Sequence, residues 1–113
     1  MAKYLNSLPS EAMKIPEREL SDVARDSHAV SQDAKDAGVY VFGGGINEDV
    51  APVCISGDSE VSTELYPESK NLNGGFTVLE LATREEAVAW AAKIAAACRC
   101  AQEMREFGYD PMS

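Results

Sequence analysis

Residues 74–97 decide the fold, and they read GGFTVLELATREEAVAWAAKIAAA. Within them, Phe76 to Leu81 is a short alternating run of the kind found in half-buried strands. Thr83 and Glu86 then have the spacing of a capping box, and they open an alanine-rich helix that ends near Ala97. A strand that leads directly into a capped helix, in a chain of only 113 residues, indicates a sheet with helices on one face.

The first helix is predicted from Pro16 to Ala37. A proline suits the first helical turn, because its missing N–H costs nothing there. Gly38 stands where a left-handed C-cap belongs. The small and apolar residues of the buried stripe recur at spacings of three and four. They are Leu20, Val23, Ala24, Ser27, Val30, Ser31 and Ala34.

The remaining elements are predicted to be strands joined by turns. They are a strand at 2–8 that Pro9 stops, a strand at 39–42, a strand at 51–56, a short arm at 60–65 that pairs back on it, and a last strand at 101–107. Gly43-Gly44-Gly45 is expected to break the second strand in a sharp turn or a close approach to another molecule. Residues 66–73 are expected to form a loop.

This order of elements predicts an α+β fold, a ferredoxin-like plait with a mainly antiparallel sheet and both helices on one face. A chain of this length makes one domain, 1–113, of which residues 108–113 are expected to be a tail. Along the strand at 76–81, Phe76 and Val78 point one way and Leu79 and Leu81 the other. One set meets the helices, and the second is left in water unless a partner covers it. We therefore expect a homodimer in which two sheets pack face to face.

Charge and composition exclude several classes of protein. Ten basic and nineteen acidic side chains give a net charge of -9, and the basic ones are not clustered, so nucleic-acid binding is not expected. The longest mostly apolar run, 87–98, contains Lys93 and is too short to span a membrane. An odd number of cysteines without a signal-peptide pattern favours a reducing compartment, and so a cytoplasmic protein.

No metal or cofactor is predicted. Cys98 and Cys100 are close in sequence, but a closed zinc site needs four ligands and only His28 and Cys54 could be added. Both cysteines are instead expected to act as small apolar side chains, Cys98 in the buried stripe of the helix and Cys100 at the start of a strand. The three glycines at 43–45 are not a dinucleotide fingerprint, because a strand follows them instead of a helix.

Several segments together resemble the YCII-related family with its DGPF motif, and the resemblance covers nearly the whole chain. It lies in Tyr66-Pro67-Glu68-Ser69-Lys70, Gly74-Gly75-Phe76-Thr77-Val78, Arg84-Glu85-Glu86-Ala87 with Trp90-Ala91-Ala92, His28, the turn at 37–39 leading into Phe42-Gly43-Gly44-Gly45, and Glu103-Met104-Arg105-Glu106-Phe107. It implies a dimeric α+β barrel with a cleft between helices and sheet, proposed as an active site with a His and an Asp in some relatives. The activity of the family is mostly unassigned. Some relatives are encoded beside extracytoplasmic-function sigma factors, which implies an accessory or regulatory role.

At the motif itself the chain differs from the family. It reads Thr63-Glu64-Leu65-Tyr66 where the family has Asp-Gly-Pro-Phe or Asp-Gly-Pro-Tyr, so Thr63 replaces the carboxylate. His28 is the candidate general acid or base, because its unperturbed pKa lies near neutrality. On the helical wheel, however, it falls well away from the apolar stripe, which equally fits a solvated histidine.

The candidate ligand-binding residues lie in two loops. Tyr66, Glu68 and Lys70 offer a phenol, a carboxylate and an ammonium near the glycines Gly43 and Gly44, although the same side chains would also suit a solvated loop. Two functions follow. One is a binding protein or enzyme for a small polar molecule held in the cleft. The other is a non-catalytic interaction protein, such as a sigma-factor accessory.

Overall fold

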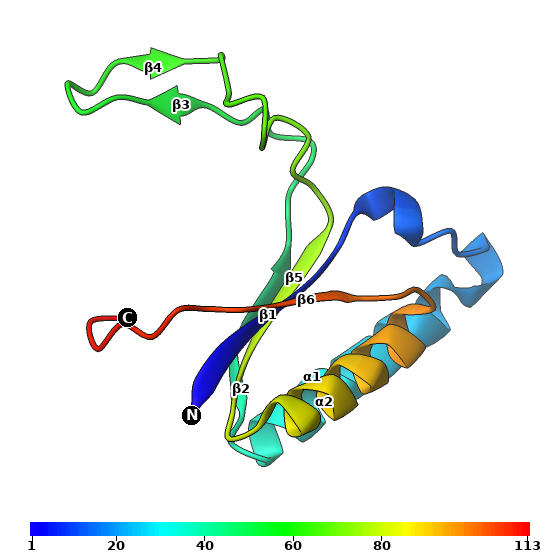
Figure 1. The fold of residues 1–113 in the computed structure, drawn as a ribbon. Helices are drawn as coiled ribbons and strands as arrows, with labels where there is room; N and C mark the ends of the chain where they lie inside the picture. The colour runs from blue at the N-terminus through cyan, green and yellow to red at the C-terminus, as the bar shows by residue number, and fades with distance from the viewer.

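The computed structural model describes residues 1–113 and shows a sheet covered on one face by two helices (Figure 1). The elements are, in chain order, β1 (Ala2–Leu8), η1 (Ser10–Ala12), η2 (Glu17–Glu19), α1 (Leu20–Asp36), β2 (Tyr40–Gly45), β3 (Cys54–Ile55), β4 (Val61–Ser62), β5 (Gly75–Leu81), α2 (Arg84–Cys98) and β6 (Glu103–Glu106). Neither helix is both long enough and apolar enough to cross a membrane.

The main sheet has the strand order β2-β5-β1-β6, and every pair of neighbours in it is antiparallel. Each helix connects two strands that have one other strand between them, which is the arrangement of a ferredoxin-like plait. The α+β fold predicted from the sequence is therefore confirmed. The β3–β4 hairpin forms a separate two-stranded sheet.

The core lies between the helices and one face of the sheet. Tyr4 and Leu79, which are opposite each other in the register of β1 and β5, are both buried. Ala34 of α1 and Ala87 and Ile94 of α2 pack against them. Full burial of a Leu or Ile side chain contributes about 1.5–3 kcal/mol, so this layer holds the helices on the sheet.

The start of α2 and the end of α1 are capped as the sequence predicts, whereas α1 begins at Leu20, after the short 3-10 turn η2, and not at Pro16. The Thr83 side chain accepts a hydrogen bond from the backbone N–H of Glu86 at 3.1 Å, as in a capping box. At the end of α1, Gly38 has a φ of 75° and Val39 N–H donates to the carbonyl of Ala34, which is a glycine C-cap. At the end of α2 the left-handed residue is Arg99, with a φ of 60°.

The predicted break at Gly43-Gly44-Gly45 is wrong. These glycines belong to β2 and pair with Thr77, Phe76 and Gly75 of β5. Backbone pairing needs no side chain, and glycine adopts the extended conformation as readily as a turn. The irregularity lies earlier, as a register shift between Tyr40 and Phe42.

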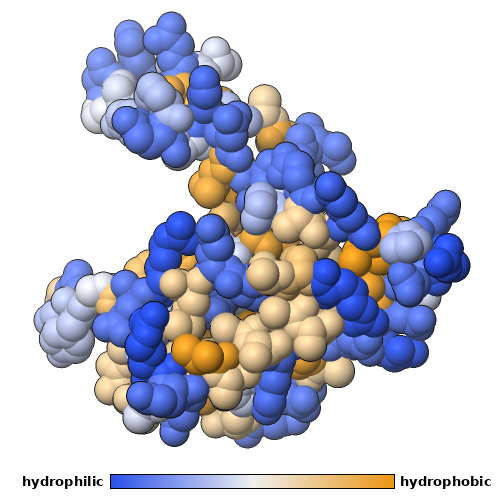
Figure 2. Space-filling model, turned by 45° about the vertical axis from the view of Figure 1, so that its right-hand side comes forward, coloured by the Kyte–Doolittle hydropathy of each residue, from blue (hydrophilic) through white to orange (hydrophobic).

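A long segment between β2 and β5, residues 46–73, stands away from the rest of the chain, and we call it the arm. Figure 1 shows it above the sheet with β3 and β4 at its end, and Figure 2 shows it as a separate lobe. Because of the arm, the radius of gyration is 15.9 Å, compared with about 13 Å for a compact domain of this length. The short arm predicted at 60–65 is therefore one part of a longer projecting segment, and it contains β4.

The face of the sheet away from the helices carries Leu5, Phe42, Phe76 and Val78, and we call it the open face. Phe42 lies opposite Val78 in the register and is 63% exposed, whereas the other three are half-buried. No helix covers this face. The apolar side chains predicted to remain on the uncovered face therefore do lie there.

Candidate functional site

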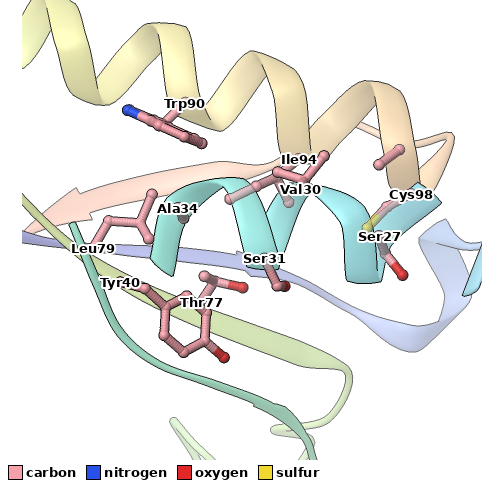
Figure 3. A pocket seen from close by; sticks show the side chains of 11 residues that line it. Ser27, Val30, Ser31, Ala34, Tyr40, Thr77, Leu79, Trp90, Ile94 and Cys98 are labelled. Atoms are coloured by element: carbon pink, nitrogen blue, oxygen red, sulfur yellow. The ribbon is translucent and has the colours of Figure 1, made fainter. Parts of the chain in front are cut away.

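A cavity of about 60 Å³ lies between the two helices and the sheet (Figure 3). It is lined by Ser27, Val30, Ser31, Ala34, Tyr40, Thr77, Leu79, Trp90, Ile94, Ala97 and Cys98. The lining residues of α1 and of α2 recur at intervals of three and four, so each helix contributes one face. Thr77 and Leu79 alternate with Phe76 and Val78 along β5 and therefore point to the helix side.

The polar groups of the cavity are hydroxyls and one thiol. Ser27 Oγ donates to the carbonyl of Ala24 at 3.1 Å and is satisfied within its own helix. The hydroxyls of Ser31, Tyr40 and Thr77 have no hydrogen-bond partner in the chain, and Figure 3 shows those of Tyr40 and Thr77 on the sheet side of the cavity. Burial raises the pKa of the Cys98 thiol, which keeps it neutral at physiological pH.

Two aromatic rings form opposite parts of the cavity wall, Tyr40 from β2 and Trp90 from α2. Each ring also carries a lysine ammonium on its surface, with Lys35 Nζ 5.1 Å from the Tyr40 centroid and Lys93 Nζ 4.3 Å from the Trp90 centroid. Such cation–π contacts hold the rings in place. Neither lysine lines the cavity, so its interior has no charged side chain.

The residue that lies opposite Thr77 in β1 is Asn6, and its side chain is 1% exposed. Its Nδ2 makes only a long hydrogen bond of 3.5 Å to the Thr77 carbonyl, and its Oδ1 has no partner. A buried amide with an unpaired oxygen is unusual, because each unsatisfied acceptor costs about 1–3 kcal/mol. The Asn6 side chain, whose residue lies opposite the cavity residue Thr77 in the sheet, therefore has an incomplete set of hydrogen bonds.

The residues singled out from the sequence do not come together in this cavity. His28 is exposed on α1, next to Ser27 in the chain but outside the lining. Tyr66, Glu68 and Lys70 are exposed on the arm. The cavity instead uses Ser27 and Ser31, which the helical stripe contains, together with Tyr40 and Thr77, which only the pairing of β2 with β5 brings together.

Gly43 and Gly44 lie on opposite faces of β2. A Cβ on Gly43 would be 2.7 Å from the Tyr40 hydroxyl, so the absence of a side chain at 43 makes room for that hydroxyl. Gly44 lies under the Phe42 ring on the open face. Of the residues predicted to bind a ligand, Gly43 is thus the one that adjoins a cavity residue.

A larger hollow of about 510 Å³ lies between the sheet and the C-terminal tail. It is lined by residues of the N-terminal end of the chain, including Lys3, by Val41, Val78 and Glu80, and by residues 106–111 and Ser113 at the C-terminal end. Lys3 Nζ donates to the main-chain oxygen of Ser113 at 3.0 Å, which holds the tail over the hollow. Its volume is in the range of small-molecule sites.

Comparison with known proteins places the chain in a family. No curated protein matches the sequence. The profile of the YCII-related domain, by contrast, matches residues 5–106, from β1 through to the end of β6. The chain therefore belongs to the YCII-related domain family.

Proposed function

We propose that the chain is a binding protein for a small, neutral molecule, held in the cavity between the helices and the sheet. The observation that carries this proposal is the set of three hydroxyls, those of Ser31, Tyr40 and Thr77, that line a mainly apolar cavity without a hydrogen-bond partner in the chain and remain open to solvent. A few placed polar groups on an apolar bed are typical of small-molecule sites.

The lining determines the ligand class. A carboxylate or ammonium inside this cavity would be buried without an opposite charge, which is costly. The ligand is therefore neutral, with an apolar part against Trp90 and Ile94 and a polar group that accepts or donates hydrogen bonds to the hydroxyls. The cavity of about 60 Å³ has room for a few water molecules, since one water needs about 10–15 Å³ of cavity volume, so the ligand has few heavy atoms unless Trp90 moves.

Binding without catalysis fits this lining best. No imidazole, carboxylate or ammonium lines the cavity, so no side chain there exchanges a proton readily near neutral pH. His28, the candidate catalytic residue, is exposed on α1. Catalysis by His28 would need a site on the outer surface of that helix.

The fluorescence of Trp90 tests the proposal, because Trp90 is the only tryptophan and lines the cavity. We expect small neutral alcohols, ketones and amides to change its emission in a saturable way. Ser31→Leu fills the cavity and should abolish that change, provided that circular dichroism shows the variant folded. His28→Ala should bind as the wild type does. Equal binding by wild type and Ser31→Leu, or loss of binding in His28→Ala, would refute the proposal.

We also propose that the chain is a homodimer formed through the open face. The chain exposes 8045 Å², whereas a self-contained monomer of its mass exposes about 6000 Å². Exposed apolar residues such as Val41 and Phe42 account for part of this excess on the open face.

The three free cysteines support a cytoplasmic location.

The second candidate function is a non-catalytic interaction protein. The exposed apolar side chains of the open face and the arm favour it, because such surfaces mark interaction sites. If the partner is a neighbouring sigma factor, a pull-down with the purified factor should recover it. Phe42→Glu, which changes the open face, should then reduce the recovery.

A further inference from the structure

We propose that the arm packs against a second copy of this chain through an apolar face made by Val53, Ile55 and Val61. The proposal rests on the homodimer proposed above and adds a second contact to it. The arm's contact is separate from the open face and can be tested separately.

The arm has two unlike faces. Ile55 lies opposite Val61 in the register of β3 and β4, while Cys54 lies opposite Ser62. Val53 comes immediately before β3, two residues from Ile55. Val53 is 50% exposed, and Ile55 and Val61 are each 65% exposed. One face of the hairpin is therefore apolar, and the chain itself does not cover it.

The hairpin has little to stabilise it alone. β3 and β4 have two residues each, and beyond their pairing the turn is closed by Ser56 N–H donating to the carbonyl of Glu60 at 3.0 Å, with Ser56 Oγ also bonded to Asp58. An isolated two-stranded hairpin is at best marginally stable in water. Contact with another surface would supply the apolar burial that the hairpin lacks.

The base of the arm is nevertheless held in a defined direction. Ile46 N–H donates to the carbonyl of Gly74 at 2.8 Å and joins the two ends of the arm. Ser10 also contacts both ends of the arm. Its Oγ donates a hydrogen bond to the Glu48 carboxylate at 2.6 Å, and its N–H donates to Asn73 Oδ1 at 3.1 Å. A projection with a fixed base loses less conformational entropy on binding than a free loop.

The exposed area indicates what covers the arm. The excess over a self-contained monomer is about 2000 Å², whereas a standard interface buries about 800 Å² on each partner. An interface of that standard size would cover less than half of the excess. Two copies related by a two-fold axis would cover both the open faces and both arms, and together they would reach the range of obligate dimers.

Charge predicts how this contact responds to salt. The arm carries six acidic side chains and one lysine, and the whole chain has a net charge of -9. Two such chains repel each other, so the apolar face must drive the contact. Added salt screens the repulsion, and association should become tighter, or stay unchanged, as the salt concentration rises. A basic partner on the arm would instead be released by salt.

Ile55→Asp tests the proposal, with Val88→Asp as the matched control. Val88 is 52% exposed on α2, so both substitutions place a charge at an exposed branched residue. We expect Ile55→Asp to weaken dimerisation at least about tenfold in sedimentation equilibrium, since charge burial at an interface is unfavourable. Val88→Asp should dimerise as the wild type does. Circular dichroism checks that both variants are folded.

A photo-crosslinker at position 55 gives a second measurement that does not depend on a destabilising change. In a sample refolded from equal amounts of ¹⁴N- and ¹⁵N-labelled chains, the crosslinked peptides should join the two labels. Crosslinks only within one label, or unchanged dimerisation of Ile55→Asp, would overturn the arm contact. If Phe42→Glu dissociates the dimer while Ile55→Asp does not, the open-face dimer stands and the arm contact fails. A monomeric wild type refutes both.

Discussion

Gly74 packs directly against the main chain of Leu8, and no side chain fits between them. Gly74 has a φ of 87°, and a Cβ placed on it would overlap the Leu8 carbonyl oxygen and approach Pro9. The carbonyl of Gly74 also accepts the hydrogen bond from Ile46 N–H that closes the base of the arm. One glycine thus joins the end of β1, the start of β5 and the arm.

Gly74→Ala should therefore be strongly destabilising. The positive φ costs an alanine about 1–2 kcal/mol, and the overlap with Leu8 adds about 1–3 kcal/mol. The matched control is Gly38→Ala, which has a φ of 75° but nothing within 4 Å of the added Cβ. Urea unfolding of both variants separates strain from overlap. Equal losses in the two variants would contradict the close approach at Leu8.

The ion pair between Arg99 and Asp26 should make stability depend on pH in the acid range. Arg99 Nη2 donates to Asp26 Oδ2 at 2.8 Å and joins the end of α2 to α1. The hydrogen bond from Arg99 lowers the pKa of the Asp26 carboxyl below its ordinary 3.8, and burial opposes this only in part. The folded state thus binds the proton more weakly than the unfolded state does.

This stabilisation is present above the ordinary carboxyl pKa and is lost as the pH falls through the lower pKa of the folded state. In urea unfolding at a series of pH values, Asp26→Asn should lose less stability than the wild type as the pH falls below about 4. Asp33→Asn, an exposed position on the same helix, serves as the control and should follow the wild type. Identical acid dependence in Asp26→Asn and the wild type would show that the pair contributes nothing.

Asn6→Leu should stabilise the fold. The Asn6 Oδ1 is buried without a partner, and replacing an unsatisfied polar group by an apolar one of similar size recovers about 1–3 kcal/mol. Asn73→Leu should have the opposite effect, because Asn73 Oδ1 accepts a hydrogen bond from Ser10 N–H. Thermal or urea unfolding measures both. A loss of stability in Asn6→Leu would mean that water or a ligand satisfies the Asn6 oxygen.

Thr83→Ala should cost about 1 kcal/mol, since it removes the hydroxyl that caps the first turn of α2. Thr83→Ser keeps that hydroxyl and should recover most of the loss. Unfolding in urea distinguishes the two variants. If serine is as destabilising as alanine, the contribution of Thr83 comes from its methyl group and not from the cap.

Most of the fold could be predicted from the sequence, because its signals are local. Pro9 marks the end of β1, the Thr83 and Glu86 pair marks the start of α2, and Gly38 marks the end of α1. The pairing of the glycines at 43–45 does not follow from local sequence, because it depends on β5, which lies about thirty residues further along the chain. Local propensity cannot show whether a flexible segment finds a strand to pair with.

The cavity could be predicted only in part. Ser27, Ser31 and Ala34 follow from the helical period, while Trp90 lies in the helix and Tyr40 in the strand that the sequence predicts. That Tyr40 and Thr77 would face the same space depends on the register shift after Tyr40, which no local pattern shows. The exposure of His28 agrees with its position away from the apolar stripe of the helix.

Sedimentation velocity of the wild-type chain at micromolar concentration tests the proposed homodimer. We expect a single species of about twice the chain mass of 12.1 kDa. A stable, well-behaved species of one chain mass, unchanged as the concentration rises, would contradict it, because the open face and the arm would then remain in water.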